Sequence, residues 1–226
     1  MFYVTGDTHM PYDISKLNTK RFPEQKSLHK DDYLIICGDF GGVWEENSRS
    51  DLYWLKWLES KRFTTLFVDG NHENFDLLNA LPVEDWNGGK IHRVRESVLH
   101  LMRGQVFNIN GYRFFSMGGG ASGDKEYRTE GISWWEQEMP CPDEYNEAWG
   151  NLEKAGFRVD YVITHTAPIS IIKQFRVRED ELPLNDFLEK VMRRTEYKKW
   201  YFGHVHEDLD IDDKHAMIYE RVLPML

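Results

Sequence analysis

The sequence predicts an α/β fold with mixed β-sheets, and two features support this prediction. Short apolar runs that end in turn residues alternate with segments of helical periodicity along much of the 226-residue chain. Asn110-Gly111, a strong signal for a tight hairpin, lies among closely spaced strand segments and indicates some antiparallel pairing. No Pro-, Gly- or Ser-rich linker separates two halves, so we expect residues 1–226 to form a single domain.

Eight segments have the composition of strands, and five of them read as buried strands. These five are FYVTGD from Phe2, DYLIICGD from Asp32, TTLFVDGNH from Thr64, DYVITHTAP from Asp160 and KWYFGHVH from Lys199. The other three, VLHLM, QVFNI and YRFFSM, lie between Ile91 and Met117. Their close spacing predicts that the middle of the chain is antiparallel.

Four segments have the periodicity or the capping residues of helices. They are a segment with Leu52, Leu55 and Leu58 at helical spacing after a Ser50 cap, a segment capped by Asn74 that ends at Ala80, a segment from about Asp143 to Ala155, and a segment from about Leu184 to Arg194. Pro142 precedes the third segment and Gly156 follows it, as is typical of the two ends of a helix.

The composition restricts the partners of the chain. The formal net charge is -10, which disfavours long DNA or RNA because such binding requires Lys and Arg facing the phosphates. No apolar run approaches the roughly 20 residues of a membrane span, and no signal-like segment opens the chain, so we expect a cytoplasmic protein without membrane contact. Cys37 and Cys141 lie in unrelated contexts and predict neither a disulfide framework nor a cysteine metal site.

The segment from Gly118 to Pro142 has two interpretations. It contains GGGASG followed by Tyr127, Arg128, Trp134 and Trp135, and it lacks the Lys-Ser/Thr ending of a nucleotide-binding P-loop. The glycines either provide a bend with the tryptophans as core anchors, or the loop lines a substrate site. In the second interpretation Trp134 or Trp135 offers a stacking surface.

Side chains that bind metal ions follow each of the five buried runs. They are Asp7 and His9, Asp39, Asn71, His165, and His204 and His206. Ligands of open α/β sheets bind outside the carboxyl ends of the strands, so these donors are expected to meet in one place. Each of these residues, taken alone, is also common in turns and caps. Their joint occurrence at five strand ends favours a metal site. A mixed set of imidazole, carboxylate and amide donors accepts several first-row divalent ions.

The remaining histidines that lack this placement are predicted to be surface or packing residues. They are His29, His92, His100 and His215.

The ordered blocks DTH, GD, GNHE, TH and GHVH, which extend from Asp7 to His206, resemble the five signature blocks of calcineurin-like metallophosphoesterases. The resemblance implies a four-layer sandwich of two mixed β-sheets flanked by helices. It also implies two divalent metal ions, with Mn as the first choice and Fe, Zn, Ni or Mg as alternatives. In the family pattern, one metal is held by Asp7, His9, Asp39 and His206, and the other by Asp39, Asn71, His165 and His204. Asp39 would bridge the two.

The activity that the resemblance implies is hydrolysis of a phosphomonoester or phosphodiester bond in a small or nucleotide-derived substrate. Two cations roughly 3.5–4 Å apart clamp the attacking and leaving oxygens and activate a hydroxide. By the same resemblance, His72 contacts the phosphate and protonates the leaving oxygen, although a turn hydrogen bond is the alternative role. Asn71, His72 and Arg128 are the expected substrate contacts.

One position departs from the family pattern. Gly42 stands third after Asp39, where many members have Asp or Arg, so the usual partner of His72 and the arginine of Ser/Thr protein phosphatases are both missing. We predict that Arg128 replaces that arginine, because a guanidinium fork matches a phosphate; a surface ion pair is the alternative. Glu73 either supports the site indirectly or makes a structural hydrogen bond.

Other functions stay open at this point. A phosphoprotein phosphatase is disfavoured by Gly42, and a nuclease is disfavoured by the acidic charge. A catalytically silent scaffold with this fold is disfavoured because every position of the expected metal set is filled.

Overall fold

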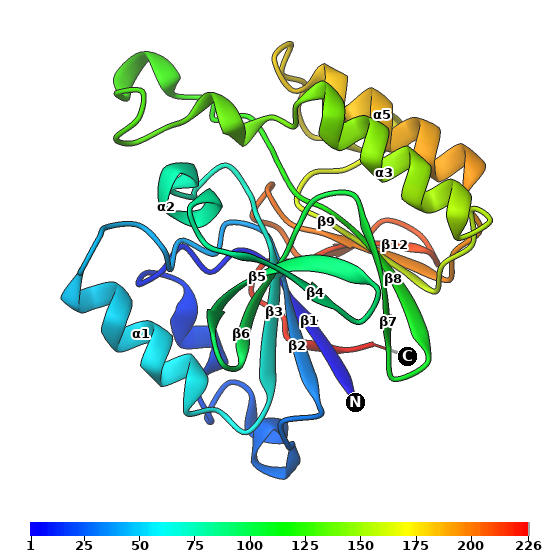
Figure 1. Ribbon diagram of the computed structural model, residues 1–226. Helices are drawn as coiled ribbons and strands as arrows, with labels where there is room; N and C mark the ends of the chain where they lie inside the picture. Colours follow the sequence, from blue (N-terminus) through cyan, green and yellow to red (C-terminus); the bar gives the residue numbers. More distant parts are fainter. Residues whose placement is uncertain (226) are drawn as a thin grey trace.

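The computed structural model describes residues 1–225 and contains two mixed β-sheets (Figure 1). The seven-stranded sheet has the order β13-β1-β2-β3-β6-β5-β4. Its strands are β1 (Phe2–Thr5), β2 (Tyr33–Cys37), β3 (Thr64–Val68), β4 (Val83–Trp86), β5 (Gly89–Arg95), β6 (Val98–Leu101) and β13 (Leu223–Pro224). The six-stranded sheet has the order β11-β12-β10-β9-β8-β7. Its strands are β7 (Gln105–Ile109), β8 (Tyr112–Met117), β9 (Tyr161–Thr164), β10 (Lys199–Phe202), β11 (Leu209–Asp210) and β12 (His215–Met217).

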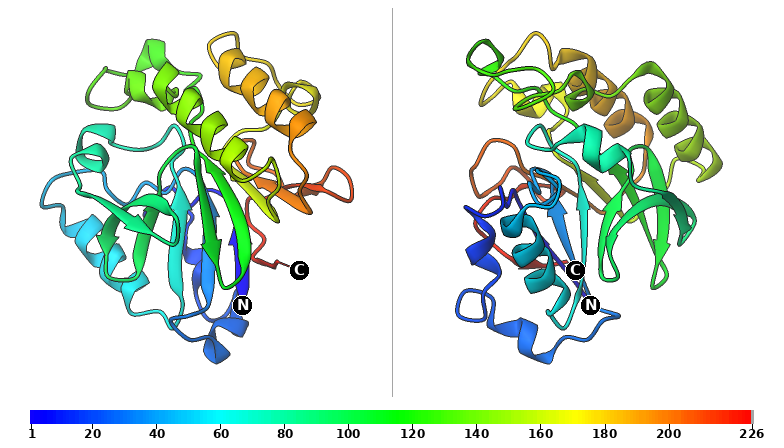
Figure 2. Two further views of the ribbon diagram at one scale, coloured as in Figure 1. Left: turned by 45° about the vertical axis from the view of Figure 1, so that its right-hand side comes forward. Right: turned by 60° about the vertical axis from the view of Figure 1, so that its left-hand side comes forward.

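Helices cover the outer faces of both sheets, which completes the four expected layers (Figure 2). They are α1 (Arg49–Glu59), α2 (Phe75–Asn79), α3 (Pro142–Lys154), α4 (Ile169–Ile172) and α5 (Leu182–Arg194), with short 3-10 helices at Ile14–Leu17, Pro23–Ser27, Lys125–Tyr127 and Glu136–Glu138. Among the helices of residues 1–225, none combines the length and the apolar character that crossing a bilayer requires.

The core consists of three apolar layers. One lies between the sheets, where Val4, Ile35 and Leu66 of the first sheet face residues such as Phe114 and Ile163 of the second. A second layer joins α3, α4 and α5 to the six-stranded sheet, and a third joins α1 and the N-terminal 3-10 helices to the seven-stranded sheet. Strands that are buried on both faces carry continuous apolar runs, which explains why these strands were predictable from the sequence.

Parallel pairing in each sheet determines where the loops converge. β1, β2, β3 and β6 are parallel neighbours, as are β12, β10, β9 and β8. The five predicted buried strands are therefore confirmed, and the carboxyl ends of parallel strands lie at one edge of their sheet.

The antiparallel prediction for the middle of the chain is only partly correct. β7 and β8 form the expected hairpin, with Asn110 and Gly111 at φ of 50° and 83°. However, β6 is parallel to β3 and β8 is parallel to β9, so the three segments are divided between the two sheets. The segments form hydrogen bonds with distant strands, and their local composition does not identify those partners.

The four predicted helices are present with small changes. α1 is capped by Ser48, whose side chain accepts a hydrogen bond from the backbone of Asp51, and not by the predicted Ser50. Asn74 caps α2 as predicted, by accepting from the backbone of Leu77. α3 and α5 begin one or two residues earlier than the predicted starts, within the usual uncertainty of helix ends.

Candidate metal centre and active site

The seven predicted metal-binding side chains lie together where the two sheets meet. Asp7, His9, Asp39 and His206 place one donor atom each within 4.8 Å of one another, and Asp39, His165 and His204 form a second such group. The amide oxygen of Asn71 lies 3.2 Å from His165 Nε2, beside the second group. Asp39 belongs to both groups. Donors from the ends of β1, β2, β3, β9 and β10 therefore converge as the strand-end argument predicted.

Several of these donors sit on unusual backbone. His9, Asp39, His204 and His206 have φ values of 33°, 46°, 70° and 60°. Non-glycine residues rarely adopt positive φ, and such residues concentrate at functional sites, where surrounding structure holds them in place. The backbone thus turns these four side chains toward the cluster at some conformational cost.

Two of the histidines have their second ring nitrogen fixed by a neighbour. His9 Nδ1 lies 2.7 Å from Asp13 Oδ2, and His165 Nδ1 lies 2.9 Å from the carbonyl oxygen of Cys37. Metal-binding histidines commonly bond their other nitrogen to a carboxylate or a backbone carbonyl, which sets the tautomer and the ring orientation. His9 and His165 therefore have the hydrogen bonds that are common among metal-binding histidines.

Glu181 plays the same part for His204, and the sequence argument missed it. Its Oε2 lies 2.8 Å from His204 Nε2 and accepts a hydrogen bond from Ala121 N, while Oε1 accepts one from the Thr166 hydroxyl. Burial acts to raise the pKa of Glu181, but the hydrogen bond and the charge of His204 hold it well below its usual value. Glu181 lies between α4 and α5, outside every motif, so no sequence signal identified it.

Glu181→Gln is expected to weaken metal binding at the second group by about tenfold, because the amide keeps a hydrogen bond to His204 but loses the charge that supports the imidazole. Competition with a chromogenic chelator measures the affinity. Glu179→Gln, which removes an exposed carboxylate two residues away, is the matched control. Unchanged affinity in Glu181→Gln would remove this residue from the site.

The electrostatics of the cluster suit cations. Burial would raise the pKa of Asp39, but the His165 charge and the His9 hydrogen bond hold it well below its usual range. Burial lowers the pKa of His9, yet the hydrogen bond and charge of Asp39 raise it to about 9. Asp7 and Asp39 are both buried, and the histidines around them lower the pKa of both carboxyl groups, as bound cations would also do. The donor types, their spacing and their supported nitrogens fit two divalent ions.

His72 lies beside the cluster but belongs to neither group. Its backbone N–H donates to Asp39 Oδ1 over 2.8 Å, and its ring packs edge-on against His9 with centroids 5.0 Å apart. Arg128 Nη2 lies 3.4 Å from His72 Nε2, while Arg128 Nε pairs with Asp124 over 2.8 Å. Arg128 therefore lies beside His72 and also forms an ion pair, which was the alternative role. Its role as a phosphate contact stays a prediction.

The position of Gly42 explains the departure from the family pattern. A β-carbon there would collide with the terminal methyl group of Met10 and the ring of Phe40, so a side chain that could serve as a partner of His72 would require both to move. Glu73, which is 1% exposed, accepts hydrogen bonds from the backbone of Phe40 and Gly41. Glu73 thus makes structural hydrogen bonds, and these bonds hold the turn that follows Asp39.

The glycine-rich loop lines the site, as the second interpretation of that segment proposed. A β-carbon on Gly120 would lie 3.0 Å from His165 Cδ2 and 3.3 Å from His204 Cε1. Asn71 Nδ2 donates to the hydroxyl of Ser122 over 3.2 Å. The loop backbone therefore approaches the second group closely, and a side chain at Gly120 would require His165 or His204 to shift slightly.

Trp135 is too buried to provide the stacking surface that was one of its two possible roles. Trp135 is 3% exposed and donates a hydrogen bond to Asp76 of α2, which makes it a core anchor for the loop. Trp134 lies under Lys125, and neither tryptophan lines the cavity at the cluster. Side-chain burial, which the sequence does not reveal for a long loop, decides between these roles.

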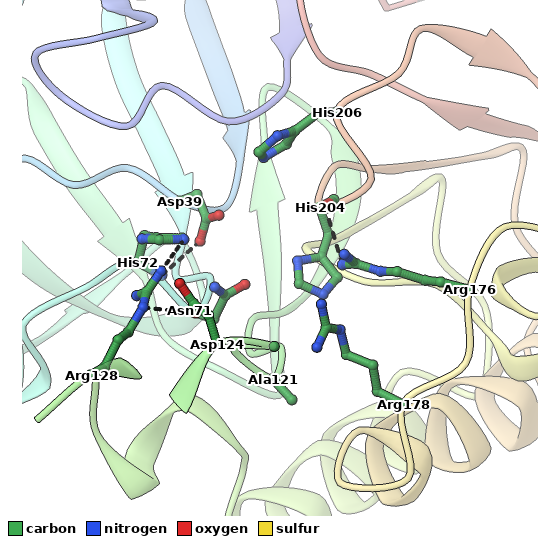
Figure 3. A pocket seen from close by; sticks show the side chains of 11 residues that line it. Asp39, Asn71, His72, Ala121, Asp124, Arg128, Arg176, Arg178, His204 and His206 are labelled. Carbon is green, nitrogen blue, oxygen red and sulfur yellow. Dashed lines mark hydrogen bonds and ion pairs between the residues drawn. The ribbon is translucent and has the colours of Figure 1, made fainter. Parts of the chain in front are cut away.

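A cavity of about 300 Å³ opens at the cluster (Figure 3). Its lining includes Asp39, His72 and Arg128, and on the other side Arg176 and Arg178, which the sequence argument did not select. A second cavity of about 630 Å³ shares His72 and His206 with the first and is lined by aromatic residues, including Tyr12 and Trp44.

The four other histidines are surface or packing residues, as predicted. His29 is exposed, whereas His92 and His100 are buried and lie 3.1 Å apart through their Nδ1 atoms. His215 is buried against the hydroxyl of Tyr197. None of the four lies in either candidate metal group.

Comparison with known proteins places these features in a family. The family model described as calcineurin-like phosphoesterase matches residues 1–208. A solved structure described as a candidate 5'-nucleotidase from Staphylococcus aureus, in complex with α-ketoglutarate, has a TM-score of 0.55 and 16% identity, covering 96% of this chain and 48% of that one. GAP50, the anchor in the inner membrane complex of Plasmodium, has a TM-score of 0.50 and 13% identity, covering 96% and 70%.

These structural likenesses concern the fold alone. The chain spans about half the length of the Staphylococcus aureus structure. No curated protein sequence matches the chain.

Proposed function

The chain belongs to the calcineurin-like phosphoesterase family, and we propose that it hydrolyses a phosphoester bond in a small substrate with the help of two divalent cations, manganese being our first choice. The convergence of two donor groups that share Asp39 is the observation that supports this proposal. We propose Asp7, His9, Asp39 and His206 for one cation and Asp39, Asn71, His165 and His204 for the other.

Bound divalent cations would supply charge neutralisation for the phosphate and would lower the pKa of water to near neutrality. Phosphoryl transfer depends mainly on position and charge stabilisation. The side chains of the protein therefore hold the cations, orient the phosphate and protonate the leaving oxygen. As a water oxygen bonds to phosphorus, the bond between phosphorus and the leaving oxygen breaks. That oxygen then requires a proton.

We assign that proton to His72. Its ring is half-buried at the cavity, next to Asp39, and belongs to neither metal group. Burial lowers the pKa of His72, and the positive charges of His9 and Arg128 lower it further, although the Asp39 charge raises it. An incoming phosphate anion acts against these lowering effects and favours the protonated imidazole. Arg128, with its Nη2 directed at His72, supplies a guanidinium for the same phosphate.

The leaving group has a suitable place in the second cavity. Tyr12 is 82% exposed there, and Trp44 lines the same space next to His72. Flat aromatic surfaces bind aromatic or heterocyclic groups by stacking. The volume of this cavity lies within the range of small-molecule sites, which supports a small or nucleotide-derived substrate.

Hydrolysis of p-nitrophenyl phosphate and of its bis ester in the presence of manganese tests the proposal. We expect turnover of at least one of the two, loss of turnover with excess chelator, and recovery when manganese is restored. Elemental analysis is expected to find two metal ions per chain. Two bound ions without turnover of either ester would instead favour a catalytically silent scaffold.

A further inference from the structure

Two arginines at the cavity have no partner for part of their charge. Arg176 and Arg178 lie in the connection between α4 and α5, and both side chains extend toward the cavity beside His204 (Figure 3). Within residues 1–225, the Nε atoms of both are buried without a hydrogen-bond partner. Arg176 Nη2 donates to the carbonyl oxygen of His204 over 3.2 Å.

This arrangement is costly without an anion. A buried donor that makes no hydrogen bond destabilises the folded state, and more so when the group is charged. The buried guanidinium of Arg103, by contrast, has partners, because it pairs with Asp69 over 2.6 Å and donates to the backbone of Gln137. No carboxylate within residues 1–225 forms an ion pair with Arg176 or Arg178. Burial lowers the pKa of Arg176 and the charge of Arg178 lowers it too, whereas the charges of Glu181, Asp39 and Asp7 raise it. Of these carboxylates, Glu181 already pairs with His204 over 2.8 Å.

The loop opposite leaves space for these groups. A β-carbon on Gly123 would collide with the guanidinium of Arg178, so the glycine allows the charge to reach the cavity. Gly123 has no positive φ that would itself demand glycine. The absence of a side chain at this position therefore serves the placement of Arg178.

The pair lies on the far side of the cavity from Arg128. Figure 3 shows Arg128 and His72 on one side, Arg176 and Arg178 on the other, and Asp39, Asn71 and His204 between them. A phosphate at the cluster already has His72 and Arg128 as contacts. The charge of the second pair is thus available for a different part of the substrate.

We propose that the substrate carries a second phosphoryl group, which is not cleaved and which Arg176 and Arg178 bind. Two guanidinium groups match the two charges of a phosphate, whereas a carboxylate would balance only one. The preferred substrate class is then a small bisphosphate or diphosphate. This inference rests on the proposed phosphoesterase function, since that function places the cleaved phosphate at the cluster.

Inhibition of p-nitrophenyl phosphate hydrolysis tests the inference. Three probes are compared in excess manganese: methylphosphonate, phosphonoacetate and methylenediphosphonate, which carry one phosphonate, a phosphonate with a carboxylate, and two phosphonates. We expect methylenediphosphonate to bind about tenfold more tightly than methylphosphonate, with phosphonoacetate between them. Isothermal titration calorimetry of the manganese-loaded protein gives the ratios of the dissociation constants of the three probes without any turnover. If the protein does not hydrolyse the ester, these ratios still test the second phosphate site, so failure of the proposed function and failure of this inference are distinguishable.

Arginine variants identify the source of the preference. Arg176→Gln and Arg178→Gln are each expected to bring the ratio between the two phosphonates close to one, and Gly123→Ala is expected to lower it by displacing Arg178 while its charge is kept. Arg158→Gln, which removes an arginine paired with Glu196 outside both cavities, is the matched control and should keep the wild-type ratio. Metal chelation by the probe is the same in all variants and cannot produce this pattern.

Several outcomes would overturn the inference. A wild-type ratio near one would exclude the second phosphate site. Phosphonoacetate as tight as methylenediphosphonate would assign the pair to a carboxylate, and equal weakening of all three probes in the variants would assign it to the cleaved phosphate. If circular dichroism shows that a glutamine variant fails to fold, two other variants replace it: Arg178→Lys, which keeps the positive charge, and Gly123→Ala. The ratio between their affinities for methylenediphosphonate and methylphosphonate then tests the inference.

Discussion

Asp39→Asn is expected to reduce turnover by at least about 10³-fold, because the shared carboxylate supplies charge to both metal groups and such groups contribute several kcal/mol to the transition state. The metal content is expected to fall from two ions to one or fewer. The substitution is nearly isosteric. Asp39 is 1% exposed with φ of 46°, a conformation that asparagine tolerates as well as aspartate does. The amide oxygen can still accept the hydrogen bond from the backbone of His72.

Loss of activity in Asp39→Asn would therefore report lost charge rather than lost fold. Kinetics with p-nitrophenyl phosphate and elemental analysis on the same sample are the required measurements, with thermal unfolding to compare stability. Asp85→Asn, on the exposed side of β4, is the control for removal of one negative charge elsewhere. Two bound metals with wild-type turnover in Asp39→Asn would refute the shared role of this residue.

The sequence predicted the donor cluster because its members lie at strand ends. Asp7, Asp39 and His165 each lie within two residues of the end of a short buried strand. Parallel pairing brings the ends of β1 and β2 to one edge of the seven-stranded sheet, and His165 reaches the same place from the end of β9 in the six-stranded sheet. A local pattern is then sufficient to predict proximity between residues that are distant in sequence. The same reasoning applies to the hairpin at Asn110, where the turn residues alone specify the pairing.

The residues that the sequence did not reveal come from connections without a repeating pattern. Glu181, Arg176 and Arg178 lie between α4 and α5, and they reach the cavity because α4 and α5 pack on the six-stranded sheet. That packing is a property of the tertiary structure. The sequence also left two roles open for Trp135, since its contact with Asp76 depends on where the long loop lies over α2.

Local sequence patterns also could not predict the order of the strands in the two sheets. The run from Val98 to Leu101 resembles any short apolar strand, yet it pairs with β3 on one side and β5 on the other. Strand propensity describes a half-buried surface rather than a particular neighbour. Which strand lies beside it is determined by the whole chain.

His72→Ala is expected to lower turnover by about two orders of magnitude or more while leaving both metal ions in place, because general acid catalysis contributes on this scale and His72 belongs to neither donor group. The size of the defect should depend on the leaving group. p-Nitrophenolate leaves without much help from a proton, whereas an alkoxide from an alkyl phosphate such as glycerol phosphate requires one. We therefore expect the variant to lose more activity on the alkyl ester than on the aryl ester.

This dependence separates the two roles that the position of His72 allows. A residue that only contacts the phosphate would lower turnover of both esters by the same factor, and a residue that only bonds the turn would lower neither. His29→Ala, which removes an exposed histidine outside both cavities, is the control for loss of an imidazole. An equal defect on both esters would assign His72 to phosphate binding and leave the leaving oxygen to be protonated by water, since Arg128, the nearest cation to its Nε2, does not release a proton in this pH range.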